Sequence, residues 1–393
     1  MSKKLIVLGL AGAFLTSALL LKSRYNFSAD LELKKLIAKV SPSPIPQRLN
    51  PVPKTVKAVY LTSWSAGNPE KINQVIELAK TTEINAVVID IKDYSGKVAF
   101  ETNSELIKQI GSKEIRIKNF KELIQKLHQE NIYIIARIAV FQDLYLAETK
   151  PELAVKNKTN SKIWRDQKNL AWVDPASRKV WDYNLEIAKQ AIALGVDELN
   201  FDYIRFPSDG DISNLAYPVY NPETETKFET IKRFFKYLNE SLKPEGIILS
   251  ADLFGQATFD ESDMNIGQII EDAYLYFDYV SPMVYPSHYA NGFLGYKNPA
   301  LYPYEVIDYS LESAIQRRVE LFSRLASGTT ELEQKKIKLA ELRPWLQAFN
   351  LGADYTPEIV RKQIQAIDDN GLDFGWYLWN PNNIYNPKAL KKE

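Results

Sequence analysis

Two aspartates at the ends of hydrophobic segments are the residues best placed to do chemistry in this sequence. The segment ELNFDYIRFPSDG (198–210) contains Asp202 and Arg205, and the segment GIILSADLF (246–254) carries Asp252 at an equivalent depth. Glycoside hydrolysis needs two carboxyl groups that flank the scissile bond. On neighbouring strands about 4.8 Å apart, two carboxyl groups can reach the separation of about 5–5.5 Å found in retaining enzymes. We therefore predict Asp202 and Asp252 as the catalytic pair.

Asp202 has a structural alternative, namely an ion pair with Arg205 or Arg137. We favour a catalytic role, because several acids are expected at the same rim and an arginine would keep Asp202 ionised. Asp202 would then attack the anomeric carbon or stabilise an oxocarbenium ion. Asp252 would protonate the leaving oxygen, which requires a pKa raised by its surroundings.

The other side chains at predicted strand ends are of the types that bind carbohydrate. Carboxylates, amides and arginine bind hydroxyl groups, and aromatic rings stack on sugar faces. The predicted substrate-binding residues are Trp64, Asp90, Lys92, Asp93, Arg137, Arg205, Tyr285, His288, Gln347, Trp379 and Asn380. Trp345 is a further stacking candidate, with a position in the barrel wall as its alternative.

Lys92 also raises a different chemistry, because a lysine at a strand end can form a Schiff base. Asp90 and Asp93 flank it in the stretch IDIKDYSG. These acids favour the charged amine and so suppress its nucleophilicity. We favour ligand binding or an ion pair, and a lysine-dependent lyase or aldolase remains a third hypothesis.

Composition excludes several classes of function. The chain has 393 residues, no cysteine and two histidines. Thiol catalysis, disulfides and thiolate-held metals are therefore excluded, and a histidine-rich metal hydrolase is disfavoured. Lys plus Arg equals Asp plus Glu at 49 each, so no basic excess indicates a nucleic-acid partner. We predict no metal and no cofactor.

From residue 56 onward, strand-like and helical segments alternate. The expected strands are 56–63, 84–91, 132–141, the start of 198–210, 246–254, 277–285, 343–349 and 374–380, and the expected helices are 69–83, 120–131, 177–195, 225–243, 266–275, 304–341 and 356–371. The strands are hydrophobic runs, which are typical of parallel strands covered on both faces. Eight such units predict an α/β fold, a (β/α)8 TIM barrel over residues 56–393, whose strand ends gather at one rim. A doubly wound open sheet is the alternative, but no glycine-rich phosphate loop follows the first strand.

The N-terminus predicts a membrane segment and a linker. MSKK precedes an uncharged run of 17 residues, 5–21, and KSR follows it. As a helix this run would span about 26 Å, the short end of the range for crossing a bilayer. We predict an uncleaved signal anchor over residues 1–24, which places the barrel outside the cytoplasm on a single-pass membrane protein. A cleaved signal peptide and a buried helix are the alternatives. Residues 25–55 are predicted as a polar, proline-rich linker.

Several longer motifs carry a family resemblance. VVIDIKDYSGKV, ELNFDYIRFPSDG, LSADLFG, SPMVYPSHYANGFLGYKNPALYPYEV and RPWLQAFNLG together resemble the bacterial family called putative glycosyl hydrolase domain, over residues 56–386. The resemblance implies a TIM barrel with a polysaccharide-related role. A looser likeness to α-amylase-like barrels, with an aspartate nucleophile on strand four and an acid on strand five, implies these roles for Asp202 and Asp252. Those barrels usually carry glutamate on strand five, so Asp252 departs from their pattern.

The sequence therefore predicts a glycoside hydrolase whose partner is a cell-wall or extracellular polysaccharide. A non-catalytic barrel that binds glycans and scaffolds the cell envelope is the alternative. Such a barrel would keep its aromatic residues and would lose little if Asp202 and Asp252 became asparagine.

Overall fold

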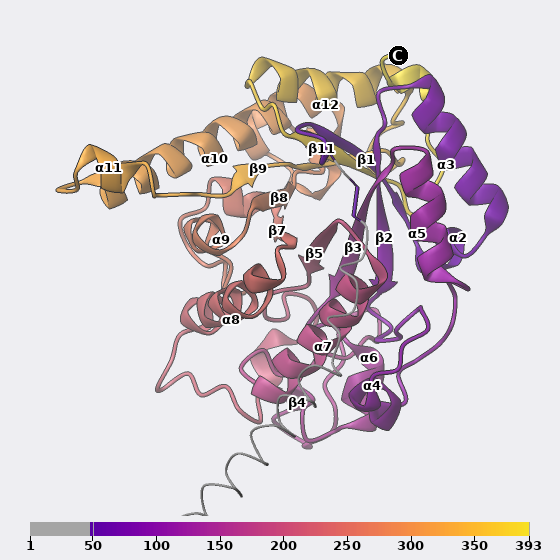
Figure 1. The fold of residues 1–393 in the computed structure, drawn as a ribbon. Coiled ribbons are helices and arrows are strands. Elements are labelled where there is room, and N and C mark those ends of the chain that lie inside the picture. The colour runs from indigo at the N-terminus through magenta and orange to yellow at the C-terminus, as the bar shows by residue number, and fades with distance from the viewer. Residues whose placement is uncertain (1–47, 50, 393) are drawn as a thin grey trace, which may run out of the picture. The chain divides into compact units, whose positions relative to one another are not determined.

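A closed parallel barrel forms the centre of the computed structural model, which describes residues 48, 49 and 51–392 (Figure 1). The strands follow the order β10-β11-β1-β2-β3-β5-β7-β8-β9, and a further pairing of β10 with β8 closes the ring. They are β1 (Val56–Leu61), β2 (Ala86–Lys92), β3 (Tyr133–Ala139), β5 (Glu198–Asp202), β7 (Ile248–Phe254), β8 (Tyr279–Met283), β9 (Glu341–Leu342), β10 (Trp345–Gln347) and β11 (Gly375–Trp379). Because β9 and β10 are two pieces of one strand position, the predicted parallel barrel with eight positions is confirmed.

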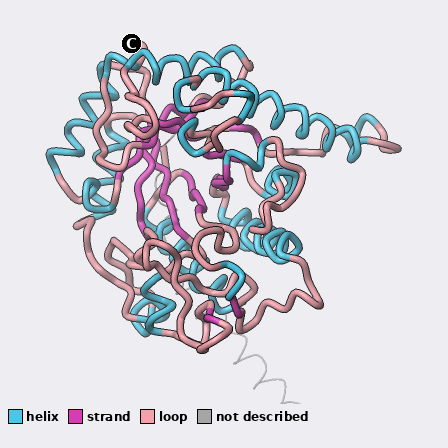
Figure 2. Tube along the Cα trace, turned by 180° about the vertical axis from the view of Figure 1, so that it is seen from behind, coloured by secondary structure: helices cyan, strands magenta, loops and turns pink. Residues whose placement is uncertain are grey.

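Helices surround the barrel on its outer side (Figure 2). They are α2 (Ser63–Ala66), α3 (Pro69–Thr81), α4 (Glu105–Ile110), α5 (Phe120–Gln129), α6 (Leu144–Thr149), α7 (Arg178–Leu194), α8 (Lys227–Leu242), α9 (Ile270–Tyr276), α10 (Pro303–Ala326), α11 (Glu331–Gln334) and α12 (Pro357–Asp369). Local sequence signals fix several of these ends. Asn68 caps α3 by accepting the Glu70 backbone N–H at 2.9 Å, and Gly195 ends α7 with φ +101°.

The predicted helix over 304–341 is wrong in its second half. Helix α10 ends at Ala326, and only the single turn α11 follows before the chain becomes extended. Gly328 adopts φ +76°, a left-handed conformation that a continuing helix does not contain. Figure 1 shows α10 running outward from the barrel, with α11 at its far end.

Alternation along each strand separates two cores, one inside the barrel and one beneath the helices. In β1, Val56, Ala58 and Tyr60 belong to the interior cluster, whereas Val59 and Leu61 pack in the outer one. Both faces are apolar, which is why the strands look like continuous hydrophobic runs in the sequence.

The interior of the barrel becomes polar along β5. Glu198, Asn200 and Asp202 alternate with Leu199 and Phe201 and so share the inner face. At the start of the strand, the Glu198 carboxylate is fully buried and accepts hydrogen bonds at 2.8 Å from Arg343 Nη1 and from the Tyr377 hydroxyl. Asp202 lies at the other end, where β5 stops.

The seam between β11 and β1 depends on a glycine. Gly375 begins β11 with φ +94°, opposite Val56 in the register of the two strands. A Cβ atom at this position would lie 1.9 Å from the Val56 carbonyl oxygen. Only glycine lets the last strand approach the first one this closely.

The predicted signal anchor, residues 1–24, lies outside the described residues, as does most of the predicted linker. Within residues 48, 49 and 51–392, no helix has both the length and the apolar character that a membrane span requires.

The first described residues contact the barrel at the end where the strands begin. Arg48 Nη1 donates to the Gly246 carbonyl at 2.6 Å, just before β7, and the Leu49 backbone N–H donates to Asp197 Oδ1 at 2.7 Å, just before β5.

The last described residues reach the same end of the barrel. The Lys391 backbone N–H donates to Glu83 Oε1 at 2.7 Å, and the Glu83 N–H donates to the Lys391 carbonyl at 3.0 Å. Glu83 lies shortly before β2.

Candidate active site

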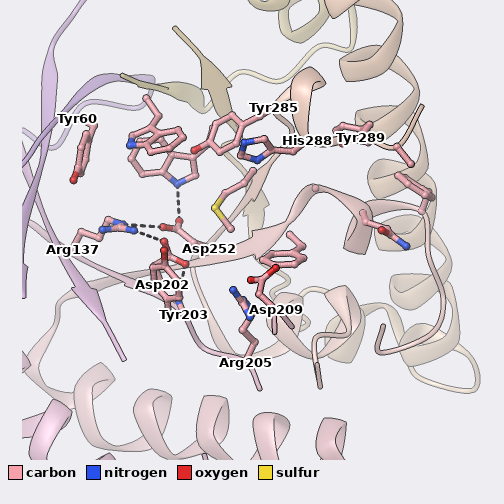
Figure 3. A pocket seen from close by; sticks show the side chains of 18 of the residues that line it. Tyr60, Arg137, Asp202, Tyr203, Arg205, Asp209, Asp252, Tyr285, His288 and Tyr289 are labelled. Carbon is pink, nitrogen blue, oxygen red and sulfur yellow. Dashed lines mark hydrogen bonds and ion pairs between the residues drawn. The ribbon is translucent and has the colours of Figure 1, made fainter. Parts of the chain in front are cut away.

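A cavity of about 680 Å³ opens at the C-terminal ends of the strands (Figure 3). Its lining residues are Tyr60, Arg137, Lys168, Asp202, Tyr203, Arg205, Asp209, Asp252, Phe254, Gly255, Gln256, Phe259, Met283, Tyr285, His288, Tyr289, Ala290, Phe293, Trp345 and Trp379. Seven residues of the predicted site are among them, namely Asp202, Asp252, Arg137, Arg205, Tyr285, His288 and Trp379. Six are not: Trp64, Asp90, Lys92, Asp93, Gln347 and Asn380.

Asp202 and Asp252 are neighbours at the base of this cavity. The register that pairs Phe201 with Ala251 places Asp202 beside Asp252 on β5 and β7. Arg137, on β3, faces both acids from one side, as the dashed lines in Figure 3 show. Its Nη2 forms an ion pair with Asp202 Oδ2, and its Nε lies 3.6 Å from Asp252 Oδ2.

The surroundings of Asp252 favour its protonated form. Its Oδ1 accepts hydrogen bonds at 2.8 Å from Asn200 Nδ2 and from Trp345 Nε1, while Oδ2 has no hydrogen-bond partner in the described part of the chain. Burial raises the pKa of Asp252 well above its usual range, and the charge of Asp202 raises it further, against the opposing effect of Arg137.

Asp202 is held in a different way. Its Oδ2 pairs with Arg137, and its Oδ1 accepts the backbone N–H of Tyr203 at 2.5 Å. Tyr203 adopts φ +52°, an unusual value for a bulky residue, which turns its N–H back toward the carboxylate. Burial, followed by the charge of Asp202, raises the pKa of the Tyr203 phenol to about 12.

Asp90 pairs with Arg137 and does not line the cavity. Its predicted contact with substrate is therefore corrected to a role in positioning Arg137. Its Oδ1 pairs with Arg137 Nη1 at 2.5 Å, and its Oδ2 accepts the Tyr60 hydroxyl at 2.5 Å. Both oxygens are therefore occupied. Burial is the largest effect on the pKa of Asp90, which is raised in spite of Arg137 and the hydrogen bond from Tyr60.

Lys92 lies outside the cavity, contrary to the predicted binding role. The pairing of β2 with β3 shifts between Asp90 and Lys92, and this irregularity turns Lys92 to the outer face of the barrel. The side chain is 0% exposed, and its Nζ pairs with Asp143 Oδ2 at 2.7 Å. An amine sealed on the outer face does not meet a carbonyl group bound in the cavity, so this location argues against a Schiff base.

Asp93 and Trp64 form a separate group on the rim. Asp93 Oδ2 pairs with Arg116 Nη1 at 2.7 Å, and the Arg116 guanidinium lies 4.9 Å from the ring centre of Trp64. Trp64 is 63% exposed. Trp64 and Asp93, both predicted to bind substrate, therefore do not line the cavity that contains Asp202 and Asp252.

Gln347 and Asn380, both predicted to bind substrate, lie outside the cavity lining, and their carboxamides hold loops together. Gln347 Nε2 donates to the Phe349 carbonyl at 3.0 Å, and its Oε1 accepts the Ser287 N–H at 3.2 Å. Asn380 Nδ2 donates to the Ala348 carbonyl at 2.5 Å.

Tyr285, His288 and Trp379 form an aromatic wall of the cavity. The rings of Tyr285 and Trp379 have centres 5.2 Å apart, and His288 meets Tyr285 edge-on at the same distance. Burial, followed by the charge of Lys168, lowers the pKa of His288, so this imidazole is neutral at pH 7. Trp345 also lines the cavity, and its indole N–H donates to Asp252, so it combines the two positions that the sequence left open.

Arg205 does not pair with Asp202, because Arg137 pairs with that carboxylate instead. Arg205 Nη1 donates to the Phe206 carbonyl at 3.0 Å and to Ser208 Oγ at 3.1 Å. Its guanidinium stacks near the rings of Phe254 and Trp172.

Two kinds of lining or supporting residue were not predicted. Asn200 and Tyr60 face the interior beside the acids, and the period of two along their strands could have identified them, since Asn200 lies two residues before Asp202. Phe259 and Phe293 come from irregular loops after β7 and β8, where no periodic pattern marks a side chain that faces the cavity.

A parallel barrel with paired carboxyl groups and aromatic side chains at its strand ends defines the class of glycosidase-like TIM barrels. The family model described as "Putative glycosyl hydrolase domain" matches residues 58–385. The chain belongs to this family, as its motifs predict.

Two solved glycosidase structures, described first, share the fold of this chain. The glycoside hydrolase domain of PgaB (BpsB) from Bordetella bronchiseptica is 14% identical, with a TM-score of 0.60, over 85% of this chain and 97% of that chain. TtGalA, an α-galactosidase from Thermus thermophilus, is 14% identical with a TM-score of 0.50, over 87% of this chain and 61% of that chain. A hypothetical protein from Ruminiclostridium thermocellum is 41% identical over 49% of this chain and 96% of that chain, with a TM-score of 0.45. No curated protein matches the chain.

Proposed function

We propose that this protein is a glycoside hydrolase that cleaves a cell-wall or extracellular polysaccharide, with Asp202 and Asp252 as its catalytic carboxyl groups. One observation carries the proposal. Two adjacent carboxyl groups share Arg137 but differ in their surroundings, since Asp202 forms the direct ion pair and Asp252 has a raised pKa. Acid and base roles are assigned in this way where two carboxyl groups have different environments.

The two groups divide the reaction between them. Asp202, ionised beside Arg137, attacks the anomeric carbon or stabilises the oxocarbenium ion that forms there. Asp252 carries a proton on Oδ2, the oxygen without a hydrogen-bond partner among the described residues, and transfers it to the leaving oxygen. Arg137, whose Nε is already 3.6 Å away, stabilises the carboxylate that Asp252 becomes. Water then attacks the anomeric carbon and gives its proton to this carboxylate, which releases the sugar and restores both groups.

The rest of the cavity suits a sugar chain. Its volume of about 680 Å³ lies within the range of small-molecule sites. Tyr285 and Trp379 offer adjacent rings for stacking on sugar faces. Membership of a family described by glycosyl hydrolysis, and likeness in fold to a glycoside hydrolase domain and an α-galactosidase, support the same general activity.

The direct test measures reducing ends released from purified bacterial wall polysaccharides and exopolysaccharides. The full chain is compared with Asp202→Asn and with Asp182→Asn, a matched change on the exposed face of α7. We expect release by the wild type, unchanged release by Asp182→Asn, and a loss of about a thousandfold or more in kcat for Asp202→Asn.

The opposite result identifies the alternative function. If no glycan in the panel is cleaved, while one binds equally to the wild type and to Asp202→Asn, the barrel is a glycan-binding scaffold. Equal release by the wild type and by Asp202→Asn would instead remove Asp202 from the catalytic role.

We further propose that the N-terminal segment anchors this protein in the membrane and that the barrel acts outside the cytoplasm. The support is the sequence alone, since residues 5–21 are uncharged and are flanked by MSKK and KSR. A polysaccharide of the wall or matrix is then within reach of the cavity.

A further inference from the structure

Arg205 is a buried cation without an acidic partner. It is 5% exposed and lines the cavity, yet it forms no ion pair with a carboxylate within residues 48, 49 and 51–392. Arg317 and Arg343, the other buried arginines of the described chain, are 9% and 1% exposed, and each pairs with an acid. Burying an unpaired charge is costly, so an unpartnered guanidinium in a cavity wall points to a ligand that completes it.

The geometry leaves one edge of this guanidinium for such a ligand. Its carbon lies 4.4 Å from the ring centre of Phe254 and 4.8 Å from that of Trp172, so aromatic rings pack around it. Nη1 is used by the Phe206 carbonyl and by Ser208 Oγ. Nε and Nη2 have no acceptor in the described part of the protein, and neither is sealed from solvent. These two nitrogens form the fork that binds a carboxylate or phosphate through two parallel hydrogen bonds.

The cavity around Arg205 carries charges of both signs. Lys168 lines the same cavity, and its positive charge reaches His288 across the opening. Asp202, on the other side of Arg205, is already paired with Arg137. Asp209 is exposed and accepts from Ser208 Oγ at 3.1 Å without forming an ion pair with Arg205; Figure 3 shows its side chain near Arg205.

We propose that Arg205 recognises an anionic substituent, a carboxylate or a phosphate ester, on a sugar bound in this cavity. The inference rests on the proposed function in one respect, that the cavity binds a glycan. It adds the class of substrate, namely an acidic polysaccharide. Arg205 lies three residues after Asp202, so one segment would both bind the anionic group of the substrate and supply the catalytic carboxylate. Burial is the largest effect on the pKa of Arg205 and lowers it, although Tyr203 and the charges of Asp202, Asp209 and Asp166 act in the opposite direction.

Binding to matched pairs of glycans tests this inference. Full-length Asp202→Asn, which does not turn over its ligand, is titrated calorimetrically with oligosaccharides of galacturonate, glucuronate and mannuronate, each beside its carboxyl-reduced form. Maltohexaose 6-phosphate and maltohexaose form the phosphate arm. We expect the acidic member of at least one pair to bind about tenfold to a hundredfold more tightly, as charge-assisted hydrogen bonds predict. The arm that shows the preference identifies the anion.

Substitution of Arg205 assigns that preference to its side chain. In the Asp202→Asn background, Arg205→Met retains a long apolar side chain between the rings and should abolish the preference, because the affinity for the acidic member should fall far more than the affinity for the neutral member. Arg205→Lys keeps a charge but not the fork, and should retain only a small part of the preference. Thermal unfolding checks that each variant is folded. If Arg205→Met does not fold, Arg205→Lys and the salt dependence of acidic binding decide.

Several results would overturn the inference. Equal affinity for the acidic and neutral members of every pair, no binding to any of them, or an equal loss of both affinities in Arg205→Met would each leave Arg205 with a packing role. Preferential binding of acidic glycans without hydrolysis by the wild type would support anion recognition by Arg205 and reject the hydrolase function. Hydrolysis of neutral glycans, with no preference for acidic ones, would support the hydrolase function and reject anion recognition by Arg205.

Discussion

At the scale of single residues, Arg137 organises the acidic end of the barrel. One guanidinium faces Asp90, Asp202 and Asp252, so three acids depend on one positive charge. Asp252 receives the longest of the three contacts, at 3.6 Å, and its pKa is raised well above the usual range, chiefly by burial. Burial and the charge of Asp202 raise the pKa of Asp252, and the longer contact with Arg137 opposes this rise only in part.

Trp345 provides a pH test of the role of Asp252. Its indole N–H donates to Asp252 Oδ1 at 2.8 Å and thereby favours the charged form. Trp345→Phe removes this donor, so the pKa of Asp252 should rise further. Because a general acid works only when protonated, activity falls as pH rises through this pKa. The alkaline limb of kcat/KM should therefore move to higher pH by about one unit.

Trp376→Phe is the matched control. Trp376 packs in the outer core, and its indole N–H has no hydrogen-bond partner in the described residues. Its replacement should leave the alkaline limb in place. A limb that does not move in Trp345→Phe, or that moves equally in both variants, would reject Asp252 as the acid.

Residue types and strand ends were sufficient to predict part of the site. Asp202, Asp252 and Arg137 converge because each lies near the end of a correctly predicted strand. In IDIKDYSG, Asp90 and Lys92 are two residues apart, so strand alternation predicts that both side chains point to the same face. The register shift between them breaks this alternation, and nothing in the sequence reveals it, so the position of Lys92 was predicted wrongly. Gln347 was misplaced because nothing in the sequence shows that backbone groups of distant loops occupy its carboxamide.

At the scale of elements, closure of the barrel depends on the junction of β11 with β1. Gly375→Ala should destabilise the fold strongly, because a Cβ atom would meet the Val56 carbonyl oxygen at 1.9 Å while φ stays at +94°. The left-handed conformation alone costs about 1–2 kcal/mol, so with the clash we expect a loss of about 3 kcal/mol or more in the free energy of unfolding.

Gly371→Ala separates the two effects in the same denaturant titration. Gly371 has φ +67°, but no atom lies within 4 Å of the Cβ position. Its replacement should cost about 1 kcal/mol through backbone strain alone. Equal losses for the two variants would show that the seam relaxes and that closure does not require glycine.

The sequence predicted long elements better than short ones. Helices with caps and buried strands have recognisable periods, and their predicted positions agree with the structure to within a few residues, except for the second half of the helix predicted over 304–341. The strands β4 (Lys156–Asn157) and β6 (Leu215–Ala216) form a small antiparallel sheet in the loops over the rim. A strand of two residues contains no period, so this sheet had no signal.

At the scale of the whole molecule, the proposed location can be tested by fractionation. The full chain should remain with membranes after extraction with high salt and with alkaline carbonate, and a protease added to spheroplasts should digest the barrel. A chain that lacks residues 1–24 should leave the membrane fraction. Recovery of the full chain in the cytosolic fraction, protected from protease, would contradict the proposal.

Both ends of the described chain meet the barrel far from the cavity. Arg48 and Leu49 contact residues that precede β7 and β5, and Lys391 contacts Glu83 before β2, whereas the cavity lies where the strands finish. A fusion partner or an immobilising surface joined at either end of this domain would therefore leave the opening unobstructed. The same barrel is suited to display on a solid support without engineering a new attachment point.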